Sequence, residues 1–110
     1  MPLAELLEKR YGNKYTYLHI GRTSNLTFLK PNRFHIQGRL PTFWVFVTTV
    51  EFVCEWAIFI GELGPAYLYG IREQDLPPNY ALEEGINGWD RGDIRIVTEH
   101  LIPVTYLREV

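Results

Sequence analysis

One stretch of the chain has the residue types to hold a ligand. Residues 15–34 read YTYLHIGRTSNLTFLKPNRF, an apolar run that ends in His19, Gly21 and Arg22 and is followed by a polar turn. Such a run is typical of a strand that delivers a histidine to a ligand. It is equally typical of an ordinary hairpin edge, in which the histidine is structural and the glycine makes the turn. The residues alone leave both interpretations open.

Several other chemistries have no motif in this sequence. There is no CxxC pair, no HExxH helix, no Walker glycine loop and no GxGxxG turn. The three histidines, His19, His35 and His100, stand in separate segments without the spacing of metal ligands, so no metal site is expected. Cys54 has apolar neighbours and no polar group to lower its pKa, which favours a packed thiol over a nucleophile.

The charge of the chain limits its partners. The net charge is −2 and the pI is near 5.9, whereas a protein that binds duplex nucleic acid needs a basic face. The basic group formed by Lys30, Arg33 and Arg39 suits a small anionic ligand better. The longest apolar run, FWVFVTTVEFVCEWAIFI, is interrupted by Glu51 and Glu55, so no membrane span is expected.

Length and composition predict one domain over residues 1–110. A chain of 110 residues with 46% hydrophobic and 15% aromatic content can fill a core without a metal or a disulfide. Cys54 is the single cysteine, and Glu5 and Glu8 occur where a signal peptide would be apolar. A cytoplasmic location is therefore expected.

The first half of the chain predicts a helix followed by strands. Leu3, Leu6 and Leu7 give residues 3–10 one apolar helical face, and Gly12 and Asn13 end this helix. Residues 15–20 read as a strand, residues 26–30 and 33–37 as short extended pieces, and residues 42–49 as a strand buried on both faces.

After Thr49, a plausible N-cap, the hydrophobic period changes to that of a helix, which ends at Gly61, Gly64 and Pro65. Strands are predicted at 66–72, 93–98 and 102–109, with a long loop over 73–92. The pattern predicts an α+β domain with a twisted, mostly antiparallel sheet and two short helices.

The order of four segments resembles that of small bacterial ADP-ribosyltransferase-like domains, including the rifamycin ADP-ribosyltransferases. The segments are YLHIGRTSNLTFLKP, WVFVTTVEFVCEWA, AYLYGIREQDLPPN and DIRIVTEHLIPVTYL. Each motif is short, and the resemblance lies in their order over residues 15–107. It implies a split sheet whose cleft holds NAD, the substrate, with the nicotinamide end bent inward.

The resemblance also implies roles for the residues around the first strand. His19 would hydrogen-bond the ribose on the adenosine side of NAD, and the backbone of Gly21 would lie against the nicotinamide end. Arg22 would supply charge to the pyrophosphate through its forked donors. Solvated or structural roles for these residues remain open alternatives.

Further along, the family's aromatic-x-Thr strand corresponds to Phe46 and Thr48. The family usually has a tyrosine where this chain has Phe46, so stacking on nicotinamide is kept but the hydroxyl is lost. Trp56 on the following helix would close the apolar wall. Phe46 and Trp56 are more typical of core packing than of a stacking platform.

The acid of the reaction has three candidates. ADP-ribosyl transfer passes through an oxocarbenium-like state, which a carboxylate near the ribose stabilises. In the rifamycin-modifying relatives this acid follows the third motif strand, which points to Asp75, although Asp75 in its proline-rich loop also suits a turn. In other branches the acid lies near the penultimate strand, which points to Asp93 or Glu99.

Three functions are compatible with this pattern. The first is a mono-ADP-ribosyltransferase acting on a small-molecule, protein or nucleic-acid acceptor, with specificity in the 31–41 and 73–92 loops. The second is an inactive binding or inhibitory protein that occupies a partner through the 78–91 segment, where Tyr80, Trp89 and Asp90 are candidate contacts. The third is a module that senses NAD without turnover.

Overall fold

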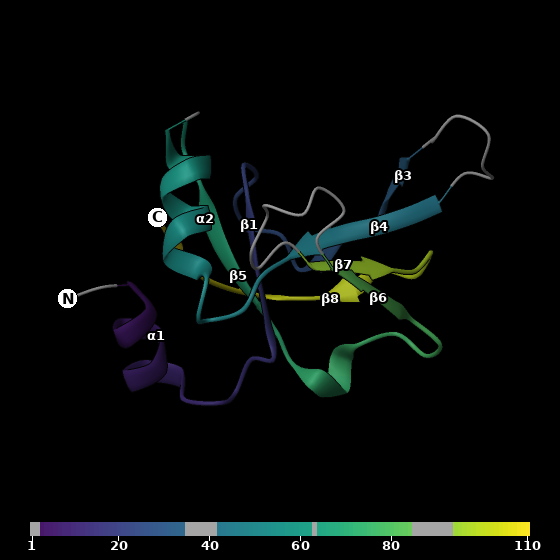
Figure 1. Ribbon diagram of the computed structural model, residues 1–110, viewed down its shortest axis with the longest axis horizontal. Helices are drawn as coiled ribbons and strands as arrows, with labels where there is room; N and C mark the ends of the chain where they lie inside the picture. The colour runs from purple at the N-terminus through teal and green to yellow at the C-terminus, as the bar shows by residue number, and fades with distance from the viewer. Residues whose placement is uncertain (1–2, 35–41, 63, 85–93) are drawn as a thin grey trace.

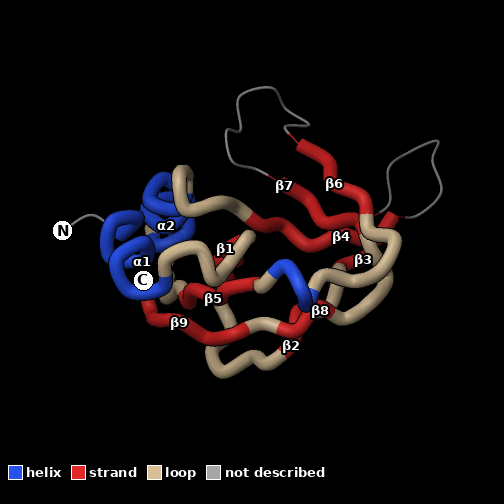
Figure 2. Tube along the Cα trace, turned by 90° about the horizontal axis from the view of Figure 1, so that it is seen from below, coloured by secondary structure: helices blue, strands red, loops and turns tan. Residues whose placement is uncertain are grey.

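Two short helices, α1 (Leu3–Tyr11) and α2 (Val53–Gly61), lie beside each other at one end of the molecule (Figures 1 and 2). The computed structural model describes residues 3–34, 42–62, 64–84 and 94–110. The amide of Gly12 donates to the carbonyl of Glu8, and Gly12 has a φ of 58°, which suits a glycine that ends a helix. The predicted first helix is confirmed and is one residue longer.

Helix α2 begins later than the sequence suggested. Phe52 occupies its N-terminal cap position without a side-chain hydrogen bond, so the prediction of Thr49 as N-cap is wrong. The carbonyl of Thr49 instead accepts a hydrogen bond from the amide of Phe52 in a turn that precedes the helix. This turn is needed because Thr48 is still held by strand pairing. The helix ends at Gly61, as predicted.

All strand pairs in the described ranges are antiparallel, and they form three sheets. The three-stranded sheet has the order β1 (Tyr17–Gly21), β5 (Tyr67–Ile71), β9 (Thr105–Glu109). The four-stranded sheet has the order β3 (Asn32–Phe34), β4 (Thr42–Val47), β7 (Ile94–Val97), β6 (Ala81–Glu84). A two-stranded ribbon pairs β2 (Phe28–Leu29) with β8 (Ile102–Pro103). The predicted α+β class with two helices and mostly antiparallel strands is confirmed.

The two larger sheets are joined at one bridge. Strand β3 pairs with β4 only as far as Trp44. Directly after the end of β4, Thr48 pairs with Leu18 of β1 through two backbone hydrogen bonds of 2.9 and 2.7 Å. The junction of β1 with the residue after β4 is therefore the point where the three-stranded and four-stranded sheets meet.

The alternating residues of β1 face two different cores. Leu18 packs with Leu7, Val53 and Leu68 in a cluster that includes both helices. Tyr17, one residue earlier, packs against the second cluster, formed by Leu29, Val45, Val47, Ile71, Ile94, Ile96 and Ile102. His19 follows Tyr17 by two positions and is therefore placed on the side of the second cluster.

Three segments differ from the sequence-based expectation. Strand β6 lies within the predicted 73–92 loop, because pairing with β7 overrides the weak strand propensity of its residues. The predicted strand 102–109 is divided, because its first part pairs with β2 and its second part with β5, while Val104 between them donates to the carbonyl of Thr27. In β4, Trp44, Val45 and Val47 are buried as expected, but Phe46 is 41% exposed.

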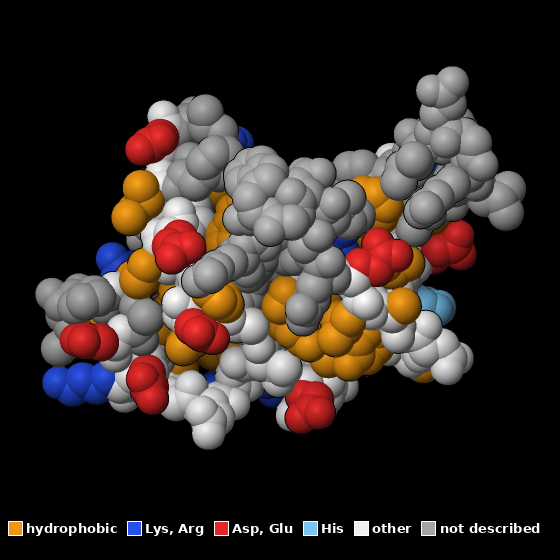
Figure 3. Space-filling view, viewed as in Figure 1, with side chains coloured by type: hydrophobic (Ala, Val, Ile, Leu, Met, Phe, Trp, Pro, Cys, Tyr) orange, Lys and Arg blue, Asp and Glu red, His pale blue; other side chains and the backbone are white. Residues whose placement is uncertain are grey.

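The surface carries acidic side chains at several separate places on the face shown in Figure 3, without one dominant acidic patch among the coloured residues. None of the helices in the described ranges has the length and apolar character needed to cross a membrane.

Candidate functional site

The imidazole of His19 lies at the junction of β1 and β4. Its Nδ1 is 2.7 Å from the carbonyl oxygen of Phe46. Because a carbonyl oxygen only accepts, Nδ1 carries the proton of this hydrogen bond. Burial lowers the pKa of His19, and the hydrogen bond to Phe46 opposes this effect less strongly. The neutral ring then has its lone pair on Nε2, which is an acceptor for a ligand hydroxyl or amide.

Gly21 makes room for the histidine ring. A Cβ atom at position 21 would lie 2.9 Å from Nε2 of His19 and 3.4 Å from Cδ2. Strand residues two apart share a face, so the ring extends over the backbone of Gly21. The glycine is therefore required by the histidine, rather than by a left-handed turn.

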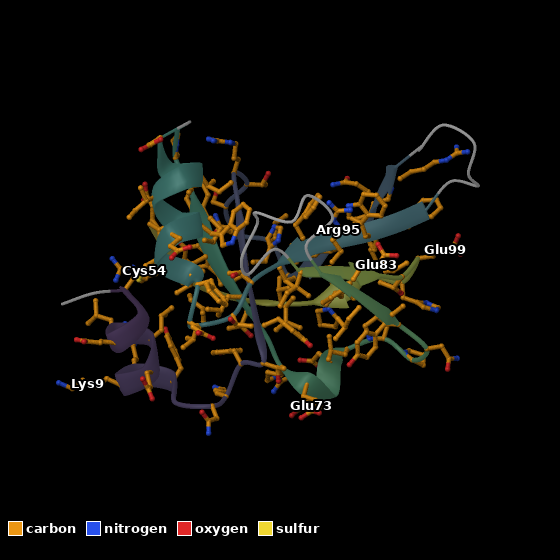
Figure 4. All side chains as sticks on the ribbon, in the orientation of Figure 1. Lys9, Cys54, Glu73, Glu83, Arg95 and Glu99 are labelled. Atoms are coloured by element: carbon orange, nitrogen blue, oxygen red, sulfur yellow. The ribbon has the colours of Figure 1, made fainter. Side chains whose placement is uncertain are left out.

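Phe46 presents a partly exposed ring on the face of β4 opposite Val45 and Val47, and therefore away from the His19 ring, so the predicted sharing of one site by the two rings is wrong. It packs edge-on against Trp44 at 6.2 Å between ring centroids. The guanidinium of Arg95, the cross-strand partner of Phe46, lies 4.8 Å from the centre of the Trp44 ring and 5.1 Å from that of Phe46. Arg95 is directed over these rings from β7, with Glu83 on the neighbouring strand (Figure 4). Sequence reasoning missed Arg95, since only the register of β4 and β7 places it there.

Thr48 belongs to the junction through its backbone. Its amide and carbonyl pair with Leu18, and its side chain is buried, with only 4% of the residue's surface exposed. Within the described ranges Oγ1 of Thr48 has no hydrogen-bond partner. The bridge partners Leu18 and Thr48 share a face, so this hydroxyl lies on the helix side of the junction, away from the His19 ring.

Arg22 leaves the junction and reaches α2. Its Nη2 donates to the carbonyl of Ile60 at 2.9 Å, in the last turn of the helix, at the negative end of the helix dipole. A Cβ at Gly64 would lie 2.8 Å from Nη1 of Arg22, so the guanidinium also fills the space beside this glycine. This contact uses one of five N–H donors, and a structural role is compatible with the predicted contact to an anion.

The two remaining predicted site residues lie on α2 and in the turn after β5. Trp56 is half-buried on α2, and its amide donates to the carbonyl of Phe52. Asp75 lies in the short 3-10 turn Glu73–Asp75, where its carboxylate accepts from Nε of Arg72 at 2.8 Å. This turn follows the end of β5 that pairs with Tyr17, so the chain has already passed the level of His19. Figure 4 shows Glu73 of the same turn well away from Arg95.

The alternative acids and the predicted contact segment are only partly described. Glu99 lies between β7 and β8, on the side of Glu83 and Arg95 in Figure 4. Asp93, Trp89 and Asp90 lie outside the described residues, as does most of the 31–41 loop. Tyr80 is half-buried and packs against the second core cluster.

The described residues contain no group of three His, Cys, Asp or Glu side chains that would hold a metal ion. Comparisons with models of protein families, with curated proteins and with solved structures find no match to this chain. The resemblance to ADP-ribosyltransferase-like domains therefore remains a prediction from the ordered motifs.

Proposed function

We propose that this domain binds NAD at the junction of β1 and β4 and acts as a mono-ADP-ribosyltransferase. The observation that carries the proposal is the hydrogen bond from Nδ1 of His19 to the carbonyl of Phe46, which orients Nε2 as an acceptor. A ribose hydroxyl of NAD is a donor that matches this acceptor. Phe46 contributes its backbone carbonyl, whereas its side chain, two positions before Thr48, lies on the strand face turned away from the His19 ring, so the proposal does not include the predicted stacking on Phe46.

The reaction breaks the bond between nicotinamide and C1 of its ribose. The bonding electrons leave with nicotinamide, an acceptor nucleophile forms the new bond to C1 and loses its proton, and the ribose carries positive charge in between. A carboxylate near C1 stabilises that charge. Asp75 is our candidate for this carboxylate, and Glu99 and Asp93 are the alternatives.

Titration calorimetry with NAD, followed by a nicotinamide-release assay, tests the proposal. We expect His19→Ala to weaken NAD binding about tenfold, which corresponds to the loss of one hydrogen bond of about 1.4 kcal/mol. His100→Ala is the matched control, because His100 is exposed in the turn after β7. Absence of binding by the unmodified protein at millimolar NAD would reject the proposal.

A second candidate function is a binding protein that lacks turnover. It is favoured by the existing partners of two predicted site residues, since Asp75 pairs with Arg72 and Arg22 with the end of α2. Binding of NAD without nicotinamide release would indicate a sensing module. Absence of both would favour a protein that acts by occupying a partner's surface.

A further inference from the structure

The segment that follows the candidate site is held by one buried hydroxyl. Loop 22–27 connects β1 to β2, and within it the carbonyl of Thr23 accepts a hydrogen bond from the Tyr69 hydroxyl. The same hydroxyl accepts a hydrogen bond from the amide of Leu26 at 3.2 Å. In a β-turn the first carbonyl and the fourth amide normally bond to each other. Here the Tyr69 hydroxyl lies between them and closes the turn.

The other residues of the turn fit this arrangement. Asn25 has a φ of 58°, in the left-handed region that asparagine tolerates better than most residues. The side chain of Leu26 packs against the second core cluster. The turn is therefore fixed by a core leucine on one side and by the tyrosine hydroxyl on the other.

Tyr69 also contacts the histidine. It is the cross-strand partner of His19, and the two ring centroids are 6.3 Å apart with planes tilted by 43°. Tyr69 is completely buried, so its ring has little freedom to move. One side chain thus contacts both the ring that would receive the ligand and the loop beside that ring.

We infer that Tyr69 is a positioning residue that fixes loop 22–27 as one wall of the ligand site next to His19. The inference rests on the proposed function, because the ligand it concerns is NAD. Beyond that function, the inference states that the affinity for NAD depends on the Tyr69 hydroxyl, which does not itself touch the ligand. Tyr69→Phe keeps the ring and removes only that hydroxyl.

The test combines amide hydrogen exchange with NAD titration. In Tyr69→Phe we expect exchange at Leu26 to become about tenfold faster and the Kd for NAD to rise about three- to tenfold, as for the loss of one hydrogen bond. Tyr106→Phe is the matched control, because it removes the same group from a tyrosine that is 41% exposed and packs edge-on against Tyr69 at 5.6 Å. We expect it to leave both quantities unchanged.

A second pair of variants reaches the same turn without touching the core. Asn25→Val places a β-branched residue at a positive φ and should raise the Kd for NAD as Tyr69→Phe does, whereas Asn25→Gly should not. A purely structural role for Tyr69 would lower the melting temperature and leave the Kd of the folded protein unchanged, which overturns the inference. Unchanged exchange at Leu26 would also overturn it. If the unmodified protein does not bind NAD, the proposed function fails, and the inference fails with it.

Discussion

Gly21→Ala is the substitution whose effect follows most directly from the geometry. The added Cβ would lie 2.9 Å from Nε2 of His19, whereas non-bonded heavy atoms prefer about 3.5 to 4.0 Å. The ring must therefore move by about 0.5 to 1 Å. The hydrogen bond from Nδ1 to Phe46 is now 2.7 Å, and such a movement away from the carbonyl takes it to or past the usual limit of about 3.2 Å. We expect the variant to fold and to lose about 1 to 2 kcal/mol of unfolding free energy.

Urea denaturation of a double-mutant cycle measures this effect. The clash disappears when His19 is replaced by alanine, so Gly21→Ala should cost little in a His19→Ala background, with a coupling energy of about 1 to 2 kcal/mol. Gly61→Ala is the control, because a Cβ there meets no atom within 4 Å. An equal cost of Gly21→Ala in both backgrounds would refute the reasoning, since the glycine would then be needed for some other reason.

Three further predictions concern pH, the missing hydroxyl and the acid. The pKa of His19 is lowered in the folded state, so its contribution to stability is complete above about pH 6.5 and is lost as the pH falls through the folded pKa; the non-titrating His19→Asn should show a smaller loss of unfolding free energy between pH 7 and 5. Phe46→Tyr should change the unfolding free energy by less than about 0.5 kcal/mol, because the ring is 41% exposed; a loss above 1 kcal/mol in urea denaturation would contradict this. Asp75→Ala should slow nicotinamide release about 100-fold, and Glu99→Ala should slow it only slightly. The reverse ranking would identify Glu99, in the turn after β7, as the carboxylate of the reaction.

The sequence was sufficient for the elements whose signals are local. The apolar face of residues 3–10 and the helical period after Thr49 indicated both helices, although the N-cap of the second was placed at Thr49, because these signals lie within one or two turns of the chain. Strand β6 could not be predicted in the same way. Residues Ala81–Glu84 have no strand pattern of their own, and they are extended because they pair with β7. Nothing in the local sequence of either segment indicates that the two will pair.

The candidate site was predictable only in part, for a similar reason. The proximity of His19 to the strand of Phe46 and Thr48 was expected from the motif order, and the structure contains this contact. The identity of the contacting group was not predictable. A backbone carbonyl, not a side chain, sets the tautomer of His19, and every residue presents such a carbonyl. The role of Gly21 as space for the ring likewise depends on a rotamer and not on a residue type.

The ion pair of Asp75 does not by itself decide between catalysis and binding. The side chains of Arg72 and Asp75 are 40% and 22% exposed, and ion pairs with this degree of exposure contribute about 0 to 1 kcal/mol. A carboxylate that speeds the reaction about 100-fold lowers the barrier by about 2.7 kcal/mol, which exceeds the stability that the loss of this ion pair would cost. Position is the stricter condition. Asp75 follows the end of β5 that pairs with Tyr17, whereas Gly21 and Arg22 lie at the opposite end of β1. An NAD molecule that engages His19 therefore has to place its nicotinamide ribose toward the Tyr17 end of β1, the end away from Gly21, for Asp75 to act on it.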